Sequence, residues 1–215
     1  MKYWENLIED IEEIASEVEW NVKGILLDND ELIEMPSMST VVTALIECFA
    51  IAKYTPYFDS KKINYTFGGE RSYPDIVLEG KGIENDVIAL DIKTCRMKSK
   101  KKISGFTLGS YGEYFRNPAV KKRGCLRPYG EFRKHIVVGF IYKWDKEAST
   151  PDKVEILERI VAEKWQLSSR KTGTGTTTAI GSITELSRIL NRDGEFSSEE
   201  EFEKYWRKYE KKKKS

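Results

Sequence analysis

Two aspartates and a lysine lie beside two apolar runs near the middle of the chain. Asp75 directly precedes the first run, and Asp91 and Lys93 lie at the end of the second. The connector, residues 79–86, contains two glycines and an asparagine, which favours a β-turn between paired strands. In such a hairpin Asp75 would approach Asp91. Because Asp91 and Lys93 are two residues apart, their side chains would project from one face of the strand.

This set of groups is suited to hydrolysing a phosphodiester with a divalent metal. Mg²⁺ prefers carboxylate and water oxygens, so Asp75 and Asp91 would bind it, and the backbone carbonyl of Ile92 would complete the metal shell. Bound Mg²⁺ would lower the pKa of an attacking water and neutralise charge in the transition state. Lys93 would orient that water or stabilise the phosphoryl oxygens. The alternative is a salt-bridge cluster on a surface hairpin.

Composition narrows the class of protein without choosing a ligand. The 215 residues fit one domain, or two small ones, and a hydrophobic fraction of 40% supports a real core. With 36 basic and 35 acidic residues the net charge is +1, so any basic surface must come from local segregation. Three separated cysteines without a CxxC pair fit a reduced, cytoplasmic protein and argue against a disulfide framework or a zinc ribbon. No run approaches the roughly 18 apolar residues of a membrane span.

Hydrophobic spacing predicts the main elements. A first helix is expected over residues 3–19. A second helix is expected to follow residues 36–39, with a serine as its N-cap, and to end at about Tyr54. Alternation predicts a strand over 61–67, and the β-branched run 135–144 indicates a central strand.

The remaining segments are less distinct in pattern. The basic stretch 96–102 is interpreted as a solvated loop, and residues 106–118 as a short helix that Pro118 ends. Residues 153–166 fit either a helix or a strand. A capping box at Ser198 begins the last helix, and the lysines at 211–214 suggest a frayed basic tail.

Two further features bear on function. Glu47 points away from the centre of the apolar face of the second helix, where a glutamate is usually a solvated residue. Residues 171–179 contain two glycines and five threonines, so backbone amides and hydroxyls there can approach a ligand closely; the alternative is a plain surface loop. The stretch has neither a P-loop ending nor a GxGxxG pattern, so no nucleotide cofactor is expected. His135, the only histidine, is interpreted as structural.

Pro74-Asp75 followed by Asp91-Ile92-Lys93 resembles the motif of the PD-(D/E)XK nucleases, and within them the type II restriction endonucleases. Further matches to that family follow in order and extend the resemblance over roughly residues 37–210. They are Phe106-Thr107-Leu108-Gly109-Ser110-Tyr111, Arg116-Asn117, Lys164-Trp165, the stretch 173–183 and the stretch 196–210.

The resemblance implies an α/β (α+β) restriction-endonuclease-like fold, with a central mixed β-sheet flanked by helices. It implies one domain over residues 1–215, with a small N-terminal dimerisation region at about 1–60. The implied activity is that of a type II site-specific deoxyribonuclease. A homodimer would use Mg²⁺, which Mn²⁺ can replace, to cut both strands of a short palindrome in double-stranded DNA and leave blunt ends.

The resemblance also assigns residues to roles. Asp75, Asp91, Lys93 and Glu47 would be catalytic, and Asp75, Asp91, Ile92 and Glu47 would bind metal. Glu70 and Arg71 would lie on the minor-groove side of the DNA. Thr107 and Ser110 would lie near the DNA backbone, and Thr94 close to the active-site strand. The major-groove recognition loop would comprise Thr172, Gly173, Thr174, Gly175, Thr176, Thr177 and Thr178.

The chain departs from the family in its reading loops. The family member it resembles has asparagines at the positions of Thr176 and Ala179, and neutral amides at those of Glu70 and Arg71. An amide offers a paired donor and acceptor to a base edge, which threonine cannot copy. We therefore expect this chain to share the family's cleavage chemistry but not the recognition sequence of the member it resembles. The alternatives are a structure-specific or repair nuclease of the same superfamily and a non-catalytic DNA-binding protein.

Overall fold

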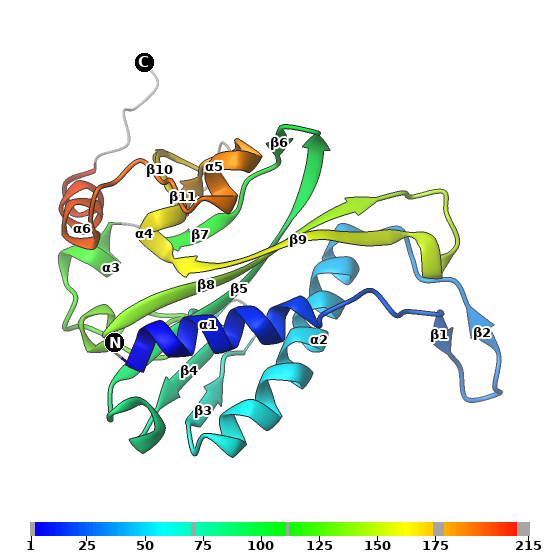
Figure 1. The fold of residues 1–215 in the computed structure, drawn as a ribbon, viewed down its shortest axis with the longest axis horizontal. Coiled ribbons are helices and arrows are strands. Elements are labelled where there is room, and N and C mark those ends of the chain that lie inside the picture. Colours follow the sequence, from blue (N-terminus) through cyan, green and yellow to red (C-terminus); the bar gives the residue numbers. More distant parts are fainter. Residues whose placement is uncertain (1–2, 70–71, 111, 174–178, 210–215) are drawn as a thin grey trace.

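The computed structural model describes residues 3–69, 72–110, 112–173 and 179–209. It is built on a mixed sheet (Figure 1), which confirms the predicted central sheet flanked by helices. The strands, in spatial order, are β3 (Asn64–Phe67), β4 (Ile76–Glu79), β5 (Val87–Ser99), β8 (Lys134–Trp144) and β9 (Val154–Glu163).

One strand pair in this sheet is parallel. β4 and β5 form the predicted antiparallel hairpin, and β5 then runs parallel to β8, from Ile88 opposite Lys134 to Arg96 opposite Tyr142. Strand β8 is buried along nearly its whole length, as its β-branched sequence predicted for a central strand. The site-bearing strand β5 is therefore held on both sides by neighbouring strands.

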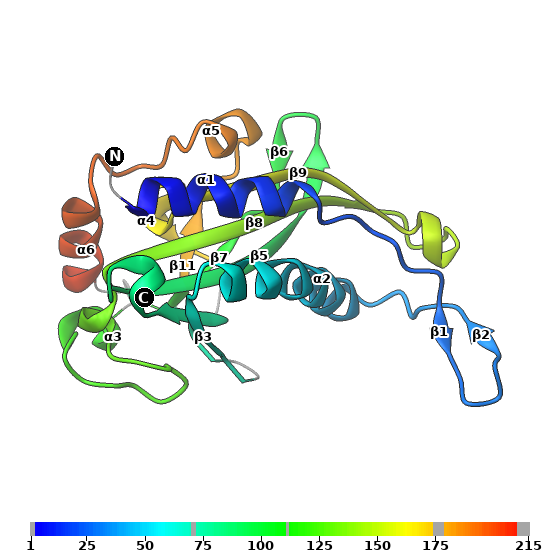
Figure 2. The same ribbon diagram turned by 60° about the horizontal axis from the view of Figure 1, so that its bottom comes forward.

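Two helices cover one face of the sheet (Figure 2). They are α1 (Tyr3–Ser16), which lies against β9, and α2 (Ser39–Ser60), which lies against β5. The predicted end of α2 at Tyr54 is wrong, and the helix continues through Pro56. Tyr54 and Phe58 prolong the buried stripe by another turn, so tertiary packing outweighs the loss of one backbone hydrogen bond at proline. Its N-cap is Met38, which provides no side-chain cap, and not a serine.

Helix α2 is long and apolar enough to cross a membrane when judged by length and composition. Its innermost residues nevertheless belong to the same core cluster as the sheet, the pattern of a core helix. They recur every four residues as Val42, Ile46, Ala50, Tyr54 and Phe58.

A smaller sheet and the remaining helices cover the other face. The small sheet has the order β10 (Ser168–Thr172), β11 (Ala179–Ser182) and β7 (Thr107–Ser110), and its neighbours are α3 (Glu113–Arg116), α4 (Lys164–Leu167), α5 (Leu186–Leu190) and α6 (Glu199–Lys208). The helix expected over 106–118 is therefore wrong in its first half, because residues 107–110 pair with β11. A partner about 70 residues away in sequence cannot be seen in the local pattern.

Three other expectations are settled by pairing and capping. The ambiguous segment 153–166 is strand β9 followed by α4. The basic stretch 96–102 is not a loop, because β5 continues to Ser99 and pairs with β6 (Lys102–Ile103), whose Ile103 is buried. At α6, Ser198 caps the helix as predicted. The Glu201 carboxylate does not complete the capping box with Ser198, because it accepts hydrogen bonds from the backbone N–H and the hydroxyl of Ser197. The tail at 211–214 lies outside the described residues.

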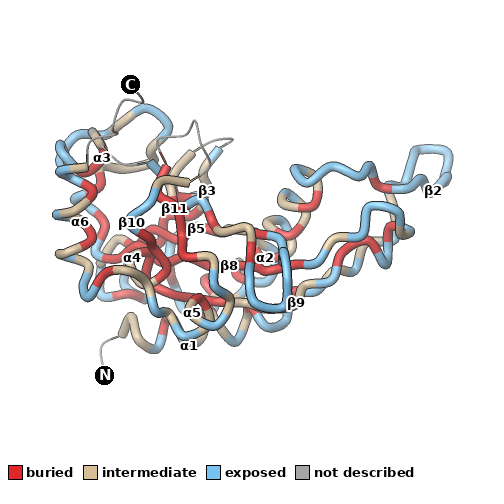
Figure 3. The backbone as a smooth tube through the Cα atoms, turned by 90° about the horizontal axis from the view of Figure 1, so that it is seen from above, coloured by how far each residue is buried: buried red, intermediate tan, exposed pale blue. Residues whose placement is uncertain are grey.

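A short hairpin extends away from the body of the molecule (Figures 2 and 3). It consists of β1 (Ile25–Leu26) and β2 (Leu32–Ile33), and its side chains are exposed although they are aliphatic. Leu26 is 67% exposed and Leu32 54%. Exposed aliphatic residues grouped on a projection mark a surface suited to protein contact.

Candidate active site

The β4–β5 hairpin sets the position of the two aspartates. Ile76 pairs with Leu90, so Asp75 lies just before the ladder and next to the strand segment that carries Asp91. There the Asp75 carboxylate accepts a hydrogen bond of 2.6 Å from the backbone N–H of Ile92. The predicted approach of the two acids is thus produced by strand register, and Asp75 is fixed to the backbone of its partner strand.

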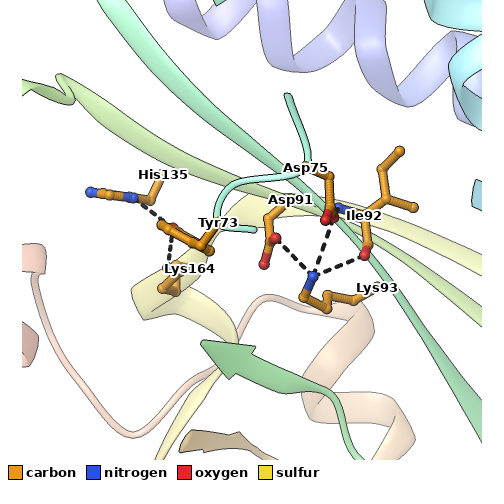
Figure 4. Close-up of polar contacts among 7 residues, drawn as sticks. All are labelled: Tyr73, Asp75, Asp91, Ile92, Lys93, His135 and Lys164. Atoms are coloured by element: carbon orange, nitrogen blue, oxygen red, sulfur yellow. Dashed lines mark hydrogen bonds and ion pairs between the residues drawn. The ribbon is translucent and has the colours of Figure 1, made fainter. Parts of the chain in front are cut away.

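The ammonium of Lys93 joins these groups (Figure 4). Its Nζ lies 2.7 Å from Asp91 Oδ1 and 3.3 Å from Asp75 Oδ2, and it donates to the carbonyl oxygen of Ile92 at 3.0 Å. The side chain of Asp91 is only 2% exposed and that of Asp75 18%. The cluster is therefore largely buried and differs from the solvated surface salt bridge considered as its alternative.

Burial and like charge shift the acid–base properties of the cluster. Burial, reinforced by the negative charge of Asp91, raises the pKa of Asp75 to about 7. The ammonium of Lys93 and the Ile92 N–H oppose that shift. Burial by itself would lower the pKa of Lys93, but the two carboxylates raise it overall. Two acids and one cation share this site, so a second cation would relieve the remaining negative charge.

The donor set fits a hard divalent cation. The oxygens of Asp75, Asp91 and Ile92 converge on one point, and Asp91 Oδ2 is buried without a hydrogen-bond partner in the part of the chain that the structure describes. No group of three or more histidine, cysteine, aspartate or glutamate side chains suited to a metal occurs among the described residues. Two carboxylates and a carbonyl suit Mg²⁺ or Mn²⁺, which retain water ligands, better than Zn²⁺.

Glu47 and Thr94 lie on the helix side of this strand. Glu47 is half-buried on α2, and its charge contributes to the raised pKa of Asp75. No hydrogen bond joins Glu47 to the cluster among the contacts described for this chain. The hydroxyl of Thr94 lies 2.9 Å from that of Thr43 on α2, so Thr94 faces away from the side of β5 that carries Asp91 and Lys93.

A cleft of about 550 Å³ opens beside the cluster. Asp91 and Lys93 line it together with Thr107 and Ser110 of β7, which the sequence placed near a DNA backbone. Thr107 also lines a neighbouring hollow of about 430 Å³, where Thr172 and Gly173 lie. The structure thus places the start of the expected recognition loop next to the cleft. The other residues of the two reading loops, 70–71 and 174–178, lie outside the described residues.

A hydrogen-bonded group at the wall of the cleft was not among the predicted site residues. Lys164 donates a hydrogen bond to the hydroxyl of Tyr73, which lies 2.7 Å from Nδ1 of His135 (Figure 4). Tyr73 and Lys164 line the cleft, and His135 lies buried behind them. Tyr73 is next to the Pro-Asp pair, and Lys164 belongs to the matched Lys-Trp pair, but neither position has a spacing that marks it as a site residue.

The comparison with known proteins decides the family. The sequence model of the restriction endonuclease EcoRV family matches residues 16–215. The chain belongs to the EcoRV restriction endonuclease family. The type II restriction enzyme EcoRV of Escherichia coli is 26% identical over 213 residues, which cover 89% of this chain and 83% of that enzyme. The resemblance drawn from the PD-(D/E)XK motif is thereby confirmed.

Membership of the EcoRV family makes the chain a type II restriction enzyme relative, that is, a nuclease with DNA as its substrate. The mixed sheet with helices on both sides is the restriction endonuclease fold. Within that fold the cleft beside Asp75, Asp91 and Lys93 is the candidate active site.

Proposed function

We propose that this protein is a Mg²⁺-dependent type II deoxyribonuclease that cuts both strands of a short palindromic site in double-stranded DNA. The observation that carries the proposal is the convergence of oxygens from Asp75, Asp91 and Ile92 on the Lys93 ammonium, at the edge of an open cleft. The protein acts in the cytoplasm, as its three free cysteines suggest, and its cuts are blunt.

The side chains divide the work of hydrolysis. Asp75, Asp91 and the Ile92 carbonyl hold Mg²⁺, with Glu47 assisting from α2, and Mn²⁺ can replace it. When bound, Mg²⁺ neutralises charge on the reacting phosphate and lowers the pKa of water. Lys93 then turns from its carboxylates toward the attacking water or a phosphoryl oxygen. Its flexible stem permits that turn, because the ammonium is a compact donor on four methylene groups.

DNA is held by the elements around the cleft. Thr107 and Ser110 are exposed on β7 and support contacts to the sugar-phosphate backbone, whereas Thr94 faces α2 from β5 and supports no such contact. Residues 172–178 read base edges in the major groove, and residues 70–71 lie on the minor-groove side. The substitution of asparagines by Thr176 and Ala179 supports a recognition sequence different from that of the E. coli enzyme.

Two copies of the chain form the active enzyme. A palindrome has twofold symmetry, and a symmetric dimer presents one active site to each strand. The N-terminal region, about residues 1–60, supplies the contact, and the exposed aliphatic hairpin β1–β2 lies within it. This region is part of one DNA-binding and catalytic domain over residues 1–215.

Digestion of random-sequence DNA with Mg²⁺, followed by sequencing of the ends, tests this function. A site-specific enzyme yields ends that share one symmetric sequence and one cut position. Ends that follow junctions or flaps instead would indicate a structure-specific or repair nuclease. Asp91→Ala should abolish cutting and retain DNA binding; a wild-type protein that binds but never nicks DNA with Mg²⁺ would be a non-catalytic DNA-binding protein.

A further inference from the structure

Lys164 is a buried lysine without a carboxylate partner among the described contacts. Its residue exposure is 3%, and its Nζ donates to the Tyr73 hydroxyl and lies 3.9 Å from the centre of the Tyr73 ring. Lys134 is also buried, but it forms ion pairs with Glu163 at 2.6 Å and Glu199 at 3.0 Å, as buried lysines usually do. Burying an ammonium without such a partner is costly, so its retention at the cleft points to a ligand.

A directed hydrogen-bond chain fixes this ammonium in place. Lys164 donates to the oxygen of Tyr73, which leaves the Tyr73 proton for Nδ1 of His135 at 2.7 Å. Burial lowers the pKa of His135 well below its usual value, so the ring is neutral and can accept that proton. The His135 ring is stacked on Tyr129 with 4.4 Å between centroids. The Tyr73 ring packs against Tyr114 and His135 in turn, so the acceptor of Lys164 is fixed. The remaining N–H groups of Lys164 are available to the cleft.

The position of Lys164 relative to Asp91 decides the ligand. Both residues line the cleft with Lys93, and the charge of Asp91 acts on the lysine. A Cβ on Gly109 of β7 would lie 3.8 Å from Nζ, so the ammonium is directly below the strand that carries Thr107 and Ser110. A group reaching this point must be anionic and small, and in a DNA strand lying across β7 that group is a backbone phosphate.

We propose that Lys164 is a second active-site ammonium, which donates to an oxygen of a backbone phosphate bound in the cleft and is positioned for it by Tyr73 and His135. The assignment rests on the nuclease function proposed above and adds to it a contact that the PD-(D/E)XK motif does not contain. Burial lowers the pKa of Lys164 to about 7, so a bound phosphate would also supply the negative charge that keeps the amine protonated.

The test pairs a lysine substitution with a charge removed from the DNA. Single methylphosphonates, which are uncharged, are placed one at a time around the cut position of the cognate duplex. Dissociation constants are measured without added metal, so that no strand is cut. At one position the methylphosphonate should weaken wild-type binding at least about tenfold and Lys164→Met binding less than about threefold, since the contact is already lost. The slope of log K against log salt should become shallower by about 0.9 per lost contact.

Matched variants separate this role from a structural one. Lys53→Met removes an exposed lysine on α2. At every modified phosphate, its DNA affinity should fall by the same factor as that of the wild type. Tyr73→Phe should reduce the effect of the methylphosphonate at the same single position as Lys164→Met does, because Tyr73 acts through the lysine. Lys164→Met should unfold at the same temperature as the wild type or higher at pH 7.5, since it removes a buried amine whose protonated form is disfavoured by burial.

Two results overturn the assignment independently of the nuclease function. In the first, the wild-type enzyme cuts DNA, but each methylphosphonate lowers the DNA affinity of Lys164→Met and of the wild type by the same factor. The second is a Lys164→Met protein that is destabilised and binds DNA normally. The nuclease proposal itself fails if the wild type never cuts DNA with Mg²⁺, which is a different result from either of these two.

Discussion

The Lys93 ammonium lies 2.7 Å from Asp91 Oδ1, on the same face of strand β5. The same ammonium contacts Asp75 and the Ile92 carbonyl, so it lies among the oxygens that are proposed to bind Mg²⁺. One strand therefore carries both a proposed metal ligand, Asp91, and the cation that balances its charge, Lys93. Lysine and metal would compete for the same lone pairs, and metal binding would release the lysine toward the substrate.

Lys93→Met tests this competition. Loss of the ammonium leaves two largely buried carboxylates without their cation, so the metal-free protein should lose about 1–3 kcal/mol of unfolding free energy. Mg²⁺ should then raise the melting temperature of Lys93→Met more than that of the wild type, because nothing competes for the oxygens. Thermal unfolding across a Mg²⁺ titration measures both effects. Lys53→Met, at an exposed pair, is the control, and an equal Mg²⁺ shift in all three proteins would contradict the shared site.

The exposed hairpin gives a prediction about assembly. Leu26→Asp and Leu32→Asp should shift the protein from dimer to monomer, because each places a charge in the proposed apolar interface. Sedimentation velocity at several concentrations measures the change. Val120, an exposed aliphatic residue outside this hairpin, provides the control Val120→Asp, which should leave the assembly unaltered. A wild type that sediments as a monomer at every concentration would exclude this role for the hairpin.

The parts that were predictable are those with local patterns. The hairpin that joins Asp75 to Asp91 follows from two apolar runs and a turn, and β8 follows from one β-branched run. Strand β7 was missed because its four residues become a strand only by pairing with β11. The burial of Lys164 was missed for a similar reason. A lysine that directly follows β9 is ordinary in sequence, and only the packing of α4 beside Tyr73 places its amine in the cleft.

Gly139 tests how the two sheets are joined. A Cβ at this position of β8 would lie 2.7 Å from the Phe106 ring and 2.8 Å from Ile160. Gly139→Ala should therefore cost about 1–3 kcal/mol through overpacking, measured by chemical denaturation. Gly69→Ala is a matched control, since its Cβ would meet the Ser72 hydroxyl at an ordinary 3.7 Å, and it should change stability by less than about 0.5 kcal/mol. Equal stabilities of the two variants would show that the sheets separate more easily than this contact implies.

The depressed pKa of Lys164 predicts how stability depends on pH. Burial lowers that pKa to about 7 from an ordinary value of 10.5, against the opposing charge of Asp91 and with help from Lys93. Between these two values the unfolded chain binds the proton and the folded protein does not, so unfolding free energy should rise as pH increases from about 7 to 10. Below pH 7 the lysine is protonated in both the folded and the unfolded state, and burial of its charge lowers the unfolding free energy by the full amount.

Lys164→Met should remove this rise. The variant should be more stable than the wild type near pH 7, and the difference should shrink as the pH approaches 10, measured by chemical denaturation at closely spaced pH values. Lys134→Met is the opposite control: Glu163 and Glu199 raise the pKa of Lys134 in spite of its burial, so its contribution is stabilising and persists up to about pH 10. A constant difference between wild type and Lys164→Met from pH 7 to 10 would show that Lys164 keeps its proton in the folded protein, and that a carboxylate such as Asp91 already balances it.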